Sequence, residues 1–201
     1  MNNGFVEFAK GLFDTGSLSS KDGYTWTLAS RVGNMLSEIE DIFGDRDKSW
    51  TILGVEINFK SSVPQNWHPG GRERKNIVFQ LVPPADRSLI NANYQLAHEV
   101  VHSLSPNIGL PVNVLEEGLA SWFAMYYVNK HFGVIMQERL NSYMVAREVV
   151  ERLLATDKNV VKKLRSVEPC FKKITRGTFE EARVFIKPEL ISALLSPFER
   201  R

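Results

Sequence analysis

Two histidines and a glutamate stand close together near the middle of the chain, in the run H-E-V-V-H from His98 to His102. Residues four apart share one face of an α-helix, so both imidazoles can bind the same metal ion. Glu99 points in a different direction from His98, which leaves its carboxylate free to take a proton from a water molecule that the metal activates. The H-E-x-x-H spacing therefore predicts a zinc peptidase site with Glu99 as the general base.

A third metal ligand is expected from the segment that follows. The run L-E-E-G-L-A from Leu115 to Ala120 places two carboxylates beyond a break long enough to fold one helix back against another. Neighbouring residues differ by about 100° around a helix, so only one of Glu116 and Glu117 can face the metal. Two histidines and one carboxylate leave a fourth position for water, which is the ligand set of a catalytic zinc site.

These motifs resemble those of the gluzincin metallopeptidases, the group that contains thermolysin and the zinc aminopeptidases. In that family the third zinc ligand is the glutamate of an E-G-x-A sequence on the helix after H-E-x-x-H, and here the matching sequence, E-G-L-A, begins at Glu117. The resemblance implies that His98, His102 and Glu117 hold Zn²⁺ and that Glu116 does not. It covers residues 98–120, and the short spacer is typical of a compact member of the family.

Several other polar residues are candidates for supporting roles. Tyr94 and Ser121 each lie one helical turn from an expected ligand and can support it from outside, although helix packing explains them equally well. The family resemblance also implies an oxyanion-stabilising Tyr or His from a helical lobe, and the sequence leaves this role open among three residues: Tyr127, His131 and Tyr143. His68 and His131 are expected to be ordinary polar or capping residues and not metal ligands.

Strands are expected before the site. Apolar residues at odd positions of 50–60, including Leu53 and Phe59, predict a half-buried strand, and the run N-I-V-F-Q-L-V over 76–82 predicts another. The intervening 61–75 is rich in turn-forming residues and is expected to be an exposed excursion able to overhang the site. Because 76–82 directly precedes the motif helix, we expect it to be the exposed edge to which an extended peptide adds.

Helices are expected elsewhere. Apolar residues at helical spacing predict a helix over 28–43 that ends at Gly44. Helix-start and helix-stop residues place the two helices of the metal site from 88 or 91 to 104, and from 111 or 113 to 133. An apolar stripe from Ile135 to Leu153 predicts a further helix. Later helix starts are expected at a T-x-x-E capping box and at a proline, namely Thr178 with Glu181, and Pro188.

Together these elements predict an α+β fold with an N-terminal α/β lobe that contains a small sheet, a zinc-binding helix pair and a helical C-terminal lobe. The catalytic lobe is expected over 1–132 and the helical lobe over 133–201, within one compact domain. The 201 residues, 43% hydrophobic and 24% charged, are typical of a globular chain able to bury a core.

Composition excludes some classes of protein. Cys170 is the only cysteine, so neither a disulfide framework nor a thiolate cluster that holds a metal by sulfur alone is possible. No run approaches the roughly 18 apolar residues of a membrane-spanning helix, and Met1 to Lys10 lacks the basic-then-apolar pattern of a signal peptide. We therefore expect a cytoplasmic protein without membrane contact, while export by a route that needs no cleaved signal stays open.

Charge is unevenly distributed along the chain. Residues 158–201 contain eleven Lys or Arg against five Glu, in a chain with a net charge of +2. Because these charges are scattered through helical segments, we interpret them as solvated helix faces and expect no nucleic-acid partner. Selection of acidic peptides is the alternative that this basic region leaves open.

The predicted activity is zinc-dependent hydrolysis of a peptide or protein substrate, in which Glu99 takes the proton of the attacking water and passes it to the leaving amine. The alternative is a metallopeptidase-like module that binds a peptide or protein partner without turnover, and the intact Glu99 argues against it. The sequence leaves open the peptide preference, the choice between endo- and exopeptidase action, and the oligomeric state.

Overall fold

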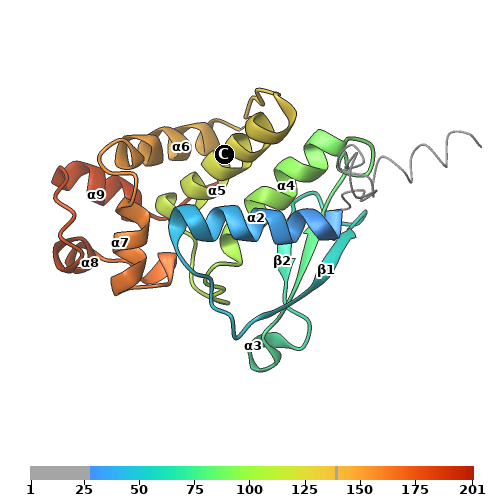
Figure 1. The fold of residues 1–201 in the computed structure, drawn as a ribbon, viewed down its shortest axis with the longest axis horizontal. Helices are drawn as coiled ribbons and strands as arrows, with labels where there is room; N and C mark the ends of the chain where they lie inside the picture. Colours follow the sequence, from blue (N-terminus) through green and yellow to red (C-terminus); the bar gives the residue numbers. More distant parts are fainter. Residues whose placement is uncertain (1–27, 139) are drawn as a thin grey trace, which may run out of the picture.

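The computed structural model describes residues 28–138 and 140–201, which form eight α-helices, one 3-10 helix and a three-stranded sheet (Figure 1). The predicted α+β class is confirmed. The interpretation of Met1 to Lys10 lies outside the described residues. In chain order the elements are α2 (Leu28–Phe43), β1 (Thr51–Ile57), β2 (Gln65–Trp67), α3 (Gly71–Arg74), β3 (Asn76–Leu81), α4 (Leu89–His102), α5 (Val114–Phe132), α6 (Asn141–Leu154), α7 (Val160–Val167), η1 (Phe171–Lys173), α8 (Arg176–Glu181) and α9 (Pro188–Leu195).

Helix α2 forms where the apolar spacing predicts it. Met35, Ile39 and Phe43 are fully buried on one face, and the helix ends at Gly44, whose φ of 91° suits a residue without a side chain. The last carbonyls of a helix lack partners within it. Here the buried guanidinium of Arg165, in α7, donates to the carbonyl oxygens of Phe43, Gly44 and Asp45 at 3.0, 2.5 and 2.8 Å. One of the basic residues of 158–201 is therefore structural.

The sheet corrects the expectation about its edge. The strand order is β1-β3-β2, with β1 parallel and β2 antiparallel to β3, so β3 is the central strand. The prediction that 76–82 is an exposed edge is wrong, because part of the excursion over 61–75 folds back as β2 and pairs with it. The edge strand nearest the motif helix is β2, and the amide of Asn66 in β2 donates to the backbone carbonyl of Glu99 at 3.1 Å.

The side-chain phase of β1 also differs from the alternation seen in the sequence. The pairing of β1 with β3 shifts between Ile52 and Gly54, so the strand changes face at that irregularity. Ile52, Val55 and Ile57 pack against the core, whereas Leu53 is 56% exposed. Phe59 lies beyond the end of the strand and is exposed. The predicted inward face holds only for the second half of β1.

Helices α4 and α5 pack against each other and match the predicted helix pair. The side chain of Ser88 caps α4 by accepting from the backbone N–H of Asn91, and the side chain of Asn113 caps α5 by accepting from that of Glu116. The second helix ends at Gly133, which has a φ of 65°. The caps confirm the predicted starts of both helices and the predicted end of α5, whereas α4 ends at His102, two residues before the predicted Leu104.

The C-terminal elements differ in detail from the prediction. Gly133 ends α5, and residues 134–138, which follow it, are not helical, so Ile135 is 84% exposed and does not join the predicted stripe. The capping box lies one turn earlier than predicted, between Thr175 and Thr178, because the Thr178 hydroxyl accepts from the Thr175 backbone in the place of a glutamate. Pro188 begins α9 as predicted.

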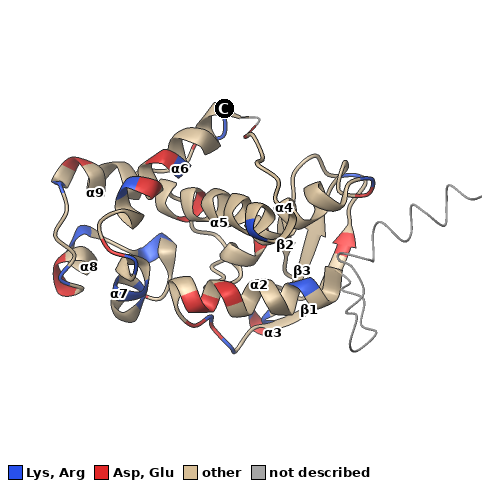
Figure 2. Cartoon of the chain, turned by 45° about the horizontal axis from the view of Figure 1, so that its top comes forward, with Lys and Arg blue, Asp and Glu red and all other residues tan. Residues whose placement is uncertain are grey.

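One buried core extends from Leu28 in α2 to Leu194 in α9 and is shared by 1–132 and 133–201. Gly118 allows α6 to approach α5 closely, because a methyl group there would overlap the backbone carbonyl of Ala146 and lie 2.6 Å from Val150 Cγ2. Figure 2 shows that Lys and Arg of the later helices are spread over several elements together with Asp and Glu. In the described part of the chain, no helix has both the length and the apolarity needed to cross a membrane.

Candidate metal centre

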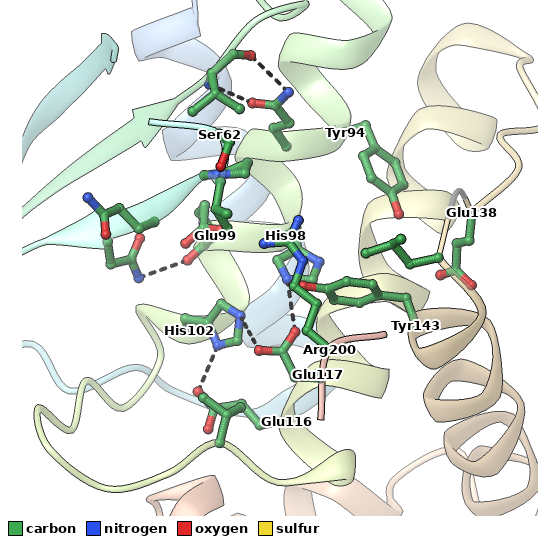
Figure 3. Close-up of a pocket in the computed structure, with 18 of the residues that line it drawn as sticks. Ser62, Tyr94, His98, Glu99, His102, Glu116, Glu117, Glu138, Tyr143 and Arg200 are labelled. Carbon is green, nitrogen blue, oxygen red and sulfur yellow. Dashed lines mark hydrogen bonds and ion pairs between the residues drawn. The ribbon is translucent and has the colours of Figure 1, made fainter. Parts of the chain in front are cut away.

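The three predicted metal ligands lie together between α4 and α5. His98 and His102 project from the last turns of α4, and Glu117 projects from the first turn of α5 (Figure 3). Each offers one ligand atom, and these three atoms lie within 4.8 Å of one another. The Glu117 carboxylate is 3.2 Å from His98 Nε2 and 3.7 Å from His102 Nε2. The fold brings together residues that are 19 positions apart in the sequence.

This arrangement fits a metal ion. Tetrahedral zinc with ligand distances of about 2.0–2.2 Å keeps neighbouring ligand atoms about 3.3–3.6 Å apart, close to the separations between Glu117 and the two imidazoles. Glu117 Oε2 is buried, and its contact with His98 Nε2 at 3.2 Å lacks the geometry of a good hydrogen bond. Buried carboxylate oxygens ordinarily have a partner, and a cation among the three side chains would supply one. Imidazole and carboxylate ligands suit zinc and also other divalent transition metals, so the cluster alone does not select zinc.

Glu116 has a role that the sequence interpretation missed. Its carboxylate is buried, and Oε1 lies 2.7 Å from His102 Nδ1. A metal-bound histidine usually donates its other ring N–H to a carboxylate, which fixes the tautomer and the ring orientation. Glu116 therefore orients His102 while Glu117 faces the metal position. Because the two side chains point about 100° apart around α5, each contacts a different part of the same site. Because metal-bound histidines usually donate to a carboxylate, the second glutamate beside Glu117 was the signal in the sequence that could have revealed this partner.

The buried charges perturb one another strongly. Burial would raise the pKa of Glu117, but the charge of His102 and the contact with His98 outweigh it and lower this pKa to about 2. Burial would lower the pKa of His102, but Glu117 and Glu116 outweigh it and raise this pKa to about 10. The two pKa shifts arise from one electrostatic attraction, which lowers the pKa of the carboxylate and raises that of the imidazole. The carboxylates thus favour positive charge at the position where the ligand atoms converge.

Glu99 lies next to the ligands but is not one of them. It is almost fully buried, and it lines the same pocket as His98, His102 and Glu117. Burial raises the pKa of Glu99 above its ordinary value, and the charges of His102 and His98 offset part of that effect. A carboxylate with a raised pKa holds a proton more readily near neutral pH, as a general base must.

The pocket above the cluster has a volume of about 440 Å³, which is in the range of ligand-binding sites. The excursion over 61–75 forms one wall with Ser62 to Asn66, and His68 also lines it, as the predicted overhang requires. His68 is not part of the metal cluster, because its ring packs on Trp50 and its Nδ1 lies 3.2 Å from the carbonyl oxygen of Asn76. Burial lowers the pKa of His68.

Only one of the three residues considered for oxyanion stabilisation lines the pocket. Tyr143, from α6, packs edge-on against the His98 ring with the ring centres 5.7 Å apart. Tyr127 instead donates to Asn34 in α2 at 2.7 Å, and His131 contacts Glu38 of the same helix at 2.6 Å. Tyr127 and His131 therefore join α5 to α2 and lie outside the pocket.

The two residues considered for support of the ligands have different positions. Tyr94 lines the pocket one turn before His98, and burial together with the charge of Glu138 raises its pKa. Ser121 is fully buried in α5 and is not among the residues that line the pocket. Sequence spacing placed both near the ligands, but only Tyr94 faces the open space above them.

No family model, curated protein or solved structure matches this chain. The geometry of the site and the motif residues themselves are therefore the only indications of function in the described part of the chain.

Proposed function

We propose that the protein is a zinc-dependent peptidase in which His98, His102 and Glu117 hold the metal and Glu99 is the general base. The observation that carries this proposal is the convergence of the three ligand atoms within 4.8 Å at the floor of a pocket that Glu99 also lines. The order H-E-x-x-H followed by a glutamate on the next helix is the sequence pattern of catalytic zinc sites, and this ligand set leaves a position open for water.

Each pocket residue has a defined task in this proposal. When bound, zinc polarises the substrate carbonyl and lowers the pKa of a water molecule towards about 7. Glu99 accepts the proton of the attacking water and then delivers it to the leaving nitrogen. Glu116 holds the His102 ring through Nδ1, so that Nε2 faces the metal position.

Tyr143 is the candidate donor to the developing oxyanion. Burial and the charge of Glu117 raise its pKa to about 12, so its hydroxyl keeps its proton at neutral pH and can donate it in a hydrogen bond. The substrate backbone would lie along β2, because β2 is the edge strand that contacts the motif helix through Asn66. A peptide bond presented there would be close to Glu99.

The test combines metal analysis with cleavage of a mixed peptide library. We expect protein purified without added metal to contain about one zinc per chain and to cleave peptides, and Glu99→Gln to keep the zinc while losing about 10²- to 10⁴-fold in rate. His131→Gln is a matched control, since His131 contacts Glu38 outside the pocket and should affect neither property. Zinc-loaded wild type that cleaves nothing in the library, yet binds a peptide as tightly as Glu99→Gln does, would favour the binding module over the enzyme.

A further inference from the structure

The segment over 196–201 brings Arg200 to the pocket that contains the metal ligands. The backbone N–H of Val114 donates to the carbonyl of Ser196 at 3.0 Å, and the N–H of Phe198 donates to that of Val112 at 2.9 Å. These bonds fix the segment against the residues that lead into α5, directly before Glu117. The position of the segment relative to the ligands is therefore set by backbone pairing.

Arg200 is held on both sides within this segment. The Phe198 ring packs on Tyr143 at 4.9 Å between ring centres, while the backbone N–H and carbonyl of Arg201 both bond to the Ser142 hydroxyl, at 3.1 and 3.0 Å. The Arg200 guanidinium carbon lies 5.9 Å from the centre of the Tyr143 ring, which in turn contacts His98. Figure 3 shows the Arg200 side chain reaching into the pocket from the side of Tyr143.

The guanidinium of Arg200 has no carboxylate partner among residues 28–138 and 140–201. The carboxylate of Glu117 is already paired with both histidines, and that of Glu116 with His102. Lys172 also lines the pocket, but its ammonium donates to the carbonyl of Asn107 at 3.1 Å. Arg200 therefore presents an exposed positive charge at the pocket that the protein itself does not neutralise.

We propose that Arg200 binds a carboxylate of the substrate and so directs the site to peptides that carry a carboxylate near the cleaved bond. The proposal rests on the peptidase function proposed above. A guanidinium offers two parallel N–H donors that match the two oxygens of a carboxylate, and the cation–π contact with Tyr143 holds it beside the pocket. That carboxylate is either the α-carboxylate at the end of a peptide or the side chain of Asp or Glu.

The first experiment separates these sources with two pairs of peptides of otherwise identical sequence. In the first pair, one peptide ends in a free α-carboxylate and the other in an amide. In the second pair, both peptides end in an amide, and one has an internal Asp where the other has Asn. For zinc-loaded Arg200→Met we expect about a tenfold rise in KM for the carboxylate form that the site recognises, with kcat and the neutral forms nearly unchanged. Arg201→Met is the matched control, because it removes the same charge from a side chain that is 80% exposed and pairs with Glu199.

The second experiment measures binding of the same peptides to the metal-free proteins by calorimetry. A tenfold loss of affinity for one carboxylate form in Arg200→Met, without any cleavage by zinc-loaded wild type, would support the role of Arg200 and reject the peptidase. Equal binding and cleavage of carboxylate and neutral forms by wild type would reject the role of Arg200 alone.

Two further results decide whether Arg200 acts on the substrate or on the protein. Loss of zinc in Arg200→Met but not in Arg201→Met would overturn the proposal, because Arg200 would then support the metal site. Arg200→Lys covers the case in which the methionine variant does not fold. Lysine keeps the charge but lacks the two parallel donors, so we expect a weaker preference for the carboxylate form, and an unchanged preference would contradict bidentate binding.

Discussion

Nδ1 of His102 lies 2.7 Å from Oε1 of Glu116, on the side of the imidazole opposite Glu117. Two consecutive glutamates of α5 thus contact the same histidine, one at each ring nitrogen. The first turn of a helix favours such carboxylates because the helix dipole is positive there. In the proposed zinc site this pairing makes Glu116 a positioning residue and Glu117 the ligand, and the two roles can be separated by mutation.

We predict that Glu117→Ala abolishes tight zinc binding and that Glu116→Ala weakens it by about 10- to 100-fold, the range typical of residues that orient a ligand. Glu116→Gln should lose less, because its amide oxygen can still accept from Nδ1. Competition with a chelator of known affinity resolves these differences. If Glu116→Ala and Glu117→Ala lose zinc equally, the division of roles is wrong.

Gly118 links the metal site to the helical segment that carries Tyr143. Alanine would favour the helix at this position by about 1 kcal/mol, but its methyl group would overlap the Ala146 carbonyl, and overpacking of this kind typically costs about 1–3 kcal/mol. We therefore predict that Gly118→Ala lowers the free energy of unfolding. It should also lower kcat, because α6 must move away and takes Tyr143 with it.

Gly33 in α2 provides the control for this prediction. A methyl group at Gly33 would meet no atom within 4 Å, so Gly33→Ala should raise the free energy of unfolding by up to about 1 kcal/mol. Urea denaturation of both variants gives the comparison. An increase in stability for Gly118→Ala similar to that for Gly33→Ala would show that α5 and α6 are not in close contact there.

The parts of the fold set by local residue patterns could be predicted from the sequence. The helix pair of the site has polar caps at Ser88 and Asn113 and a glycine at 133, and all three signals are visible in the sequence. The ligand set followed from spacing on one helix together with the resemblance at Glu117. The caps and the spacing of His98 and His102 depend on contacts within a few residues, where helix geometry decides the outcome, whereas the position of Glu117 beside them depends on the packing of α5 against α4.

Features that depend on distant contacts could not be predicted in the same way. The pairing of β2 with β3 joins an irregular excursion to a buried strand, and no periodicity marks three residues such as Gln65–Trp67 as an edge. The contact of Arg200 with Tyr143 likewise depends on how the segment over 196–201 pairs with Val112 and Val114. In both cases the contacting residues are far apart in the sequence, and only the tertiary structure shows that they meet.

The pH dependence of metal binding gives the last prediction. In the metal-free protein the pKa of His102 is raised from 6.5 to about 10, so its imidazole is protonated at pH 8 and must lose that proton to bind a metal. We predict that zinc binding at pH 8 releases about one proton, and that the apparent affinity rises about tenfold per pH unit between pH 7 and 9. Calorimetry in buffers of different ionisation enthalpy measures the proton release.

The same shift predicts how the stability of the metal-free protein changes with pH. A raised pKa in the folded state favours folding below the unfolded value of 6.5, and this contribution is lost as the pH rises through about 10. The lowered pKa of Glu117 contributes above 4.5 and is lost as the pH falls towards 2. The contribution of this pair to the free energy of unfolding should therefore be largest between pH 4.5 and 6.5. In Glu117→Gln the free energy of unfolding should fall less steeply on either side of this range.

The outcome of the zinc titration decides the protonation state of His102. A zinc affinity independent of pH between 7 and 9, with no proton released, would contradict a protonated His102 in the metal-free site.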